Sequence, residues 1–124
     1  MTNDKKVQWA LRIGVAGEFL GHGMLAIGGK ADWITWTQNI LHVSQGTAAI
    51  IMLLIGCLDV LLAILVLIKP IRPFILWMAI WGFWTALLRP IVGQSIWDFV
   101  ERFANFGAPL ALYFLMMPSQ DKTS

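Results

Sequence analysis

Glu18 and His22 are the first residues of this sequence that could do chemistry, because both lie inside an apolar stretch and are spaced four residues apart. On a helix this spacing places the carboxylate beside the imidazole, where a hydrogen bond would fix the orientation of the ring. A histidine held in this way can bind a polar head group or exchange a proton.

Other charged and polar residues interrupt the later apolar stretches of the chain. At about 1.5 Å of rise per helical residue, several of them reach a similar depth in the outer half of a membrane. A charge at the bilayer centre costs at least about 2.5–3.5 kcal/mol, so these groups should face one another rather than lipid. We therefore predict one internal polar site, whose ligand-binding candidates are Glu18, His22, Arg89, Glu101, Arg102 and Asn105.

Two details sharpen this predicted site. An intramembrane arginine needs a partner, so Arg89 is expected to pair with Glu101 or Glu18. Pro109 has no N–H, which leaves the carbonyl of Asn105 without its helical donor and free to accept from a ligand or water.

Three further charges are interpreted as structural. Arg12 is shallow enough for its long side chain to reach the cytoplasmic interface. Asp59 lies deep in the membrane and its short side chain cannot easily reach water, so it needs a partner inside the protein. Asp98 lies near the rim of the membrane. All of these charges could equally form a network that only holds the helices in register, and the sequence does not decide between the two interpretations.

No metal site is predicted, because Cys57 is the single cysteine and no group of ligands has metal-binding spacing. Haem is disfavoured as well, since a two-histidine haem would need a second histidine at the depth of His22, and His42 falls near the outer loop.

The elements that position these residues follow from composition. The chain has 124 residues, 58% of them hydrophobic, which is too apolar for a soluble domain of this size. Four stretches are long enough to cross a bilayer, and short turns between them favour antiparallel packing. We predict an all-α, integral membrane four-helix bundle forming a single domain over residues 1–124, with helices at about 7–28, 45–68, 74–93 and 97–117.

A short segment separates the first two helices. Within residues 31–42, Trp33, Trp36 and Ile40 have helical spacing, which predicts an amphipathic helix at the membrane interface, with a loop as the alternative. Farther along, Trp77, Trp81 and Trp84 form a stripe that is expected to face lipid or a partner protein.

Small residues indicate where helices approach closely. Gly17 and Gly21 have the Gly-x-x-x-Gly spacing and extend a seam that also contains Ala10, Gly14 and Gly28. The second helix offers a matching seam of Ala49, Gly56 and Ala63, so the first two helices are expected to pack along these residues.

The basic residues predict the orientation in the cell membrane. Lysine and arginine flank one side of the predicted helices, which places both termini in the cytoplasm; the residues are Lys5, Lys6, Lys69, Arg72 and Lys122. Because topology explains these charges, no nucleic-acid partner is predicted.

Two segments resemble the DoxX-like family of small membrane proteins. They are Gly17–Gly23, with sequence GEFLGHG, and Glu101–Leu112, with sequence ERFANFGAPLAL. The resemblance covers nearly the whole chain and implies a four-helix membrane protein. The family takes its name from subunits of a thiosulfate:quinone oxidoreductase, so the resemblance also implies quinone-linked redox chemistry and a quinone as cofactor.

The leading functional hypothesis is therefore a redox-associated membrane protein with a polar pocket that opens toward the outer face. Two alternatives stay open. One is a non-enzymatic subunit or assembly factor, which would bind a membrane protein partner or a second copy of itself in the bilayer. The other is a small proton-coupled transporter or channel, for which four helices leave little room.

Overall fold

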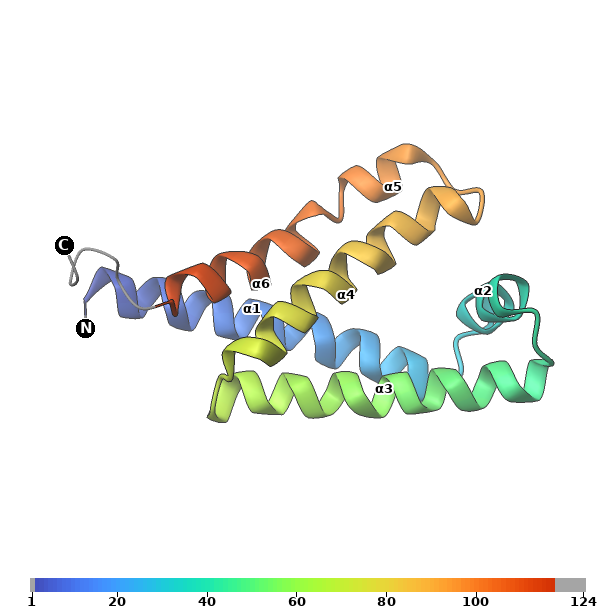
Figure 1. Cartoon of the computed structure of the whole chain (residues 1–124), viewed down its shortest axis with the longest axis horizontal. Coiled ribbons are helices and arrows are strands. Elements are labelled where there is room, and N and C mark those ends of the chain that lie inside the picture. The colour runs from blue at the N-terminus through green and yellow to red at the C-terminus, as the bar shows by residue number, and fades with distance from the viewer. Residues whose placement is uncertain (1, 118–124) are drawn as a thin grey trace.

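The computed structural model describes residues 2–117, which are helical apart from short turns (Figure 1). The helices are α1 (Asn3–Ile27), α2 (Ala31–Leu41), α3 (Gln45–Ile68), α4 (Arg72–Ile91), α5 (Ile96–Val100) and α6 (Phe103–Leu115). The all-α prediction is confirmed for this part of the chain, and α3 has the bounds that the sequence predicted.

Helix starts are fixed by side-chain caps. The hydroxyl of Thr2 accepts from the backbone N–H of Lys5 at the start of α1, and Ser44 accepts from Thr47 at the start of α3. Such caps satisfy backbone donors that have no partner within the helix. Gly29, with φ of +75°, turns the chain out of α1 toward α2. The segment after α1 is a helix, as predicted, and the alternative of a loop is wrong.

Three helices, α1, α3 and α4, are long and apolar enough to cross a membrane. The chain over the fourth predicted stretch is instead divided into α5 and α6, with a turn at Glu101 and Arg102 between them. A guanidinium N–H of Arg102 donates to the carbonyl of Asp98 at 2.8 Å, which stabilises this turn.

The helices form a V that is closed at one end and open at the other (Figure 1). Helix α1 packs along α3 and also against α6, and α6 packs along α4. Although α3 and α4 are consecutive, they diverge from their shared turn and barely contact each other. Helix α2 lies against α3 at the open end, so it covers the space that the divergence creates.

The apolar core lies where α1, α3, α4 and α6 meet. Its largest fully buried side chains include Phe19, Ile75, Met78 and Leu112, each at most 2% exposed. In a bilayer, where lipid is as apolar as these side chains, their close van der Waals packing is what stabilises the bundle.

The closest approach of α1 and α3 uses a different glycine from those predicted. A Cβ on Gly23 would lie 2.8 Å from the carbonyl oxygen of Gly56, and a Cβ on Gly56 would lie 2.8 Å from that of Gly23. By contrast, Gly14, Gly17 and Gly21 have no neighbouring atom within 4 Å of such a Cβ. The predicted packing of α1 on α3 is confirmed and Gly56 was identified correctly, but the close contact on α1 is made by Gly23 and not by Gly14, Gly17 or Gly21.

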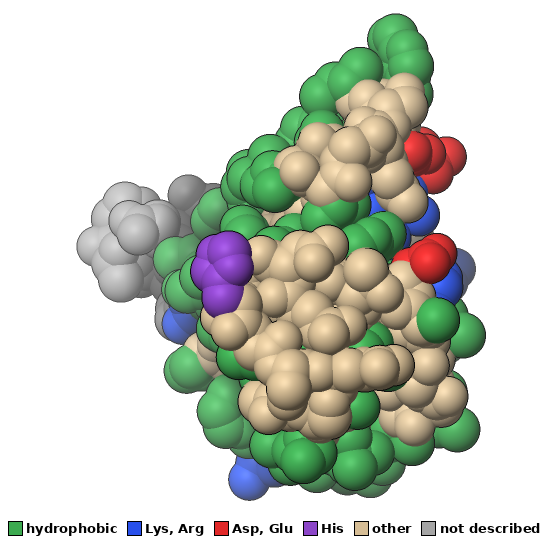
Figure 2. Space-filling model, turned by 90° about the vertical axis from the view of Figure 1, so that its right-hand side faces the viewer, with side chains coloured by type: hydrophobic (Ala, Val, Ile, Leu, Met, Phe, Trp, Pro, Cys, Tyr) green, Lys and Arg blue, Asp and Glu red, His purple; other side chains and the backbone are tan. Residues whose placement is uncertain are grey.

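The charge asymmetry on which the topology depends is visible in the fold. The start of α1, the end of α6 and the α3–α4 turn share one end of the molecule, which carries Lys5, Lys6, Lys69 and Arg72 (Figure 1). Lys122 lies outside the described residues. Figure 2 looks onto the opposite end, where lysine and arginine side chains occupy little of the surface.

Candidate functional site

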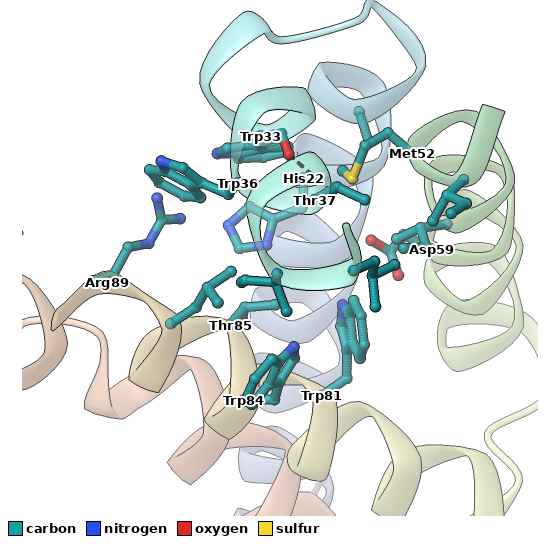
Figure 3. A pocket seen from close by; sticks show the side chains of 16 residues that line it. His22, Trp33, Trp36, Thr37, Met52, Asp59, Trp81, Trp84, Thr85 and Arg89 are labelled. Atoms are coloured by element: carbon teal, nitrogen blue, oxygen red, sulfur yellow. Dashed lines mark hydrogen bonds between the residues drawn. The ribbon is translucent and has the colours of Figure 1, made fainter. Parts of the chain in front are cut away.

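A cavity of about 290 Å³ occupies the space between the diverging helices α3 and α4 (Figure 3). Helix α2 covers it and α1 contributes His22 and Ala26 to its wall. Its size is near the lower limit of known ligand pockets, which suits one ring-sized head group.

The cavity walls are mainly aromatic and aliphatic. Trp33 and Trp36 come from α2, and Trp81 and Trp84 come from α4. The expectation that the α4 tryptophans face lipid or a partner does not hold for Trp81, which packs inward, whereas Trp84 lines the cavity and is also 38% exposed. Trp77 is 41% exposed and stacks on Trp81 with a centroid separation of 5.7 Å, so it supports the wall from outside.

Arg89 lies at one end of the cavity and is only 7% exposed. Its guanidinium carbon lies 4.8 Å from the ring centroid of Trp36 and 6.0 Å from that of Trp33. The two indole faces stabilise the positive charge of Arg89, but they do not accept hydrogen bonds from its N–H groups. No side-chain hydrogen bond or ion pair is made by the Arg89 guanidinium among residues 2–117, and its buried Nε has no partner there, so the group has donor capacity left for a ligand at this end of the cavity.

The ion pair expected for Arg89 does not form among residues 2–117. Glu101 pairs instead with its neighbour Arg102, at 2.8 Å, and the side chain of Glu101 is 64% exposed. The break between α5 and α6 explains the difference, because it turns both residues away from the direction that a continuous helix would give them.

His22 is half-buried and lies between Arg89 and Asp59 in the cavity (Figure 3). Its ring meets Trp33 edge to face, with centroids 5.7 Å apart. No hydrogen bond joins His22 to Glu18 within the described residues, and Glu18 does not line the cavity. The i, i+4 relation therefore places the two residues near each other without the predicted contact.

Asp59 occupies the end of the cavity opposite Arg89 (Figure 3). It is 3% exposed, and none of the side-chain hydrogen bonds formed by residues 2–117 ends on its carboxylate. The sequence correctly indicated that Asp59 must face the protein interior, but its interpretation as a structural charge missed its place in the cavity.

The other sequence candidates lie elsewhere. Glu101, Arg102, Asn105 and Asp98 do not line the cavity. The carbonyl of Asn105, expected to be free for a ligand, packs against Gly82 of α4, where a Cβ would overlap it. The Asn105 carbonyl, which Pro109 leaves without a helical donor, thus lies in the close contact between α6 and α4.

Arg12 has a structural role of a different kind from the one predicted. Its Nε donates to the carbonyl of Val66 at 2.8 Å, and an Nη donates to the carbonyl of Leu67. The guanidinium lies 3.8 Å from the ring centroid of Trp9, and the residue is only 7% exposed. Arg12 therefore satisfies carbonyls in the last turn of α3, a partnership that its depth along the helix did not predict.

Two threonines were missed by the sequence interpretation. Thr37 and Thr85 line the cavity, and their hydroxyls donate to the helix carbonyls of Trp33 and Gly82. Their oxygens keep acceptor capacity toward the cavity. The one sequence signal near Thr37 was the helical spacing of Trp33, Trp36 and Ile40, which gives α2 an apolar face.

The described residues bring together no group of three histidine, cysteine, aspartate or glutamate side chains that could hold a metal ion. The arrangement is instead a cavity with aromatic walls, a cation at one end and a carboxylate at the other. In comparisons with protein-family models, curated proteins and solved structures, nothing matches this chain.

Proposed function

We propose that this chain is an integral membrane protein that binds the head group of a lipid-soluble quinone in the cavity between α3 and α4. The single observation that carries the proposal is Arg89, whose buried guanidinium lies at one end of an aromatic cavity and makes no hydrogen bond or ion pair with the other described residues. A quinone carbonyl is an acceptor that would satisfy this donor.

The walls of the cavity support the same ligand class. A flat quinone ring would stack against indole faces such as Trp36 and Trp84, and aromatic stacking of this kind contributes about 0.5–1.5 kcal/mol beyond burial. His22, which lies between Arg89 and Asp59, would offer a second polar contact to the head group. The apolar tail would leave between α3 and α4, the two helices that diverge.

The proposal includes the membrane arrangement. Helices α5 and α6 together form the fourth crossing, and both termini are cytoplasmic, so that the cavity lies in the outer half of the bilayer. The resemblance to DoxX-like proteins supports the four-helix arrangement and the link to quinone-coupled redox chemistry. Impermeant thiol labelling of cysteines introduced at positions 3 and 94, in a Cys57→Ala background, tests the orientation. Labelling of position 3 from outside intact cells would reverse it.

Quinone binding is tested with the purified full-length protein in mild detergent. Bound lipids are extracted for quinone analysis, and a short-tailed benzoquinone is titrated while tryptophan fluorescence is recorded, because four indoles line the cavity. Arg89→Gln should weaken binding about tenfold, as expected for the loss of one hydrogen bond from a charged donor.

Arg102→Gln is the matched control, because Arg102 is a partly exposed arginine outside the cavity and its replacement should leave binding unchanged. A folded wild-type protein that carries no quinone and binds none at membrane concentrations would overturn the proposal. The polar residues would then be explained by a structural role in a non-enzymatic subunit.

A further inference from the structure

The two charged ends of the cavity have opposite hydrogen-bonding needs. The guanidinium of Arg89 is a donor group that finds no acceptor among residues 2–117. The carboxylate of Asp59 is an acceptor, and it receives no hydrogen bond from a side chain among residues 2–117. Unsatisfied buried groups of this kind are costly, so a ligand that supplies both partners gains the most from binding.

The two residues cannot satisfy each other, because Figure 3 places them at opposite ends of the cavity with His22 between them. Between them the cavity is lined mainly by apolar side chains, and the polar exceptions are His22, Thr37 and Thr85. A ligand for this cavity therefore needs an acceptor at one edge of a flat ring and a hydroxyl donor at the opposite edge.

The oxidation state of a quinone decides whether it meets this requirement. The oxidised form has a carbonyl acceptor at each edge, so one carbonyl would accept from Arg89 while the other faced the carboxylate of Asp59. The reduced form has hydroxyl groups, which both donate and accept. One quinol hydroxyl can accept from Arg89 while the other donates to Asp59.

Resting on the proposed function, we propose that with Asp59 ionised this site selects the quinol over the quinone, and that Asp59 is the residue that sets this preference. His22 does not discriminate, because a neutral imidazole offers one donor and one acceptor and suits either form. Asp59 is thus a specificity-determining residue, whereas Arg89 contributes to the binding of both forms.

The test compares a short-tailed benzoquinone with its chemically reduced quinol under anaerobic conditions, using the full-length protein and calorimetric titration. The quinol should bind about tenfold more tightly, the effect of one additional hydrogen bond to a charged group. Asp59→Asn should bring the two affinities to within about twofold, because an amide can donate to a carbonyl and accept from a hydroxyl. Asp98→Asn is the control, since Asp98 lies outside the cavity, and it should keep the preference.

A second probe needs no variant. The dimethyl ether of the same quinol retains the ring but has no hydroxyl donor, so it should bind wild-type protein no better than the quinone. Equal affinity for quinone and quinol would overturn the preference and leave the proposed function intact. Binding of neither form would overturn both.

Discussion

Arg12 and Arg89 are buried to the same extent, 7% exposed each, yet they lie in opposite surroundings. Arg12 donates to the carbonyls of Val66 and Leu67 and stacks on Trp9. Arg89 lies beside Trp36, and its Nε has no partner in the part of the chain that the structure describes. The first arginine joins two helices at the closed end of the fold, and the second faces a cavity at the open end.

The difference shows why burial alone does not identify a functional charge. A buried cation that is fully hydrogen-bonded stabilises the fold, and its removal leaves orphaned acceptors. A buried cation without an acceptor is destabilising unless a ligand completes it, and such groups are concentrated at binding sites. The two arginines therefore make opposite predictions about stability and binding.

The largest effect is expected at the closed end. Arg12→Ala should lower the free energy of unfolding by about 4 kcal/mol, because two hydrogen bonds from a charged donor are lost and carbonyls of Val66 and Leu67 lose their partner. Reversible unfolding in mixed detergent micelles measures the change. A loss below about 1 kcal/mol would mean that Arg12 reaches the interface and has no structural role.

A smaller loss is expected where α1 and α3 hold the wall of the cavity. Gly56→Ala should destabilise the protein by about 2 kcal/mol, because the added Cβ would lie 2.8 Å from the carbonyl oxygen of Gly23 and the helices would have to separate. Gly17→Ala is the matched control, with open space at its Cβ, and should leave stability unchanged or slightly improved. Equal losses for both variants would contradict the observed helix contact.

Much of the fold could be predicted because apolar length and spacing report it directly. The bounds of α3 and the helical state of residues 31–41 followed from hydropathy and from Trp33, Trp36 and Ile40. The break between α5 and α6 could not be predicted, because Glu101 and Arg102 have no helix-breaking residue beside them. The turn is held by a local contact, in which the guanidinium of Arg102 donates to the carbonyl of Asp98 four residues earlier, and its residue types do not signal that contact.

The candidate site was predicted only in part. His22 and Arg89 were correctly brought together, because both are polar residues at similar depth in long helices. Asp59 was not grouped with them, because its depth was counted along a helix from the predicted cytoplasmic end. Such a count ignores the divergence of α3 from α4. Glu101 and Asn105 were included because a continuous fourth helix was assumed. Depth along a helix therefore predicts which residues need a partner, and helix tilt decides which ones meet.

The last prediction concerns the open end and has the smallest expected effect on stability. Arg89→Met keeps much of the side-chain volume and removes a buried cation whose Nε has no partner. Because an uncompensated buried charge is destabilising, the free energy of unfolding should stay the same or rise by up to about 1 kcal/mol. The same variant should lose affinity for both the benzoquinone and its quinol, since the guanidinium that donates to each is gone. Stability is measured as for Arg12→Ala, and binding by titration.

A loss of stability as large as that of Arg12→Ala would show that Arg89 has structural partners in the membrane and would remove the contrast between the two arginines. Unchanged stability with lost binding would instead fit the trade-off that binding sites commonly show, in which a group retained for its ligand contributes nothing to the empty fold.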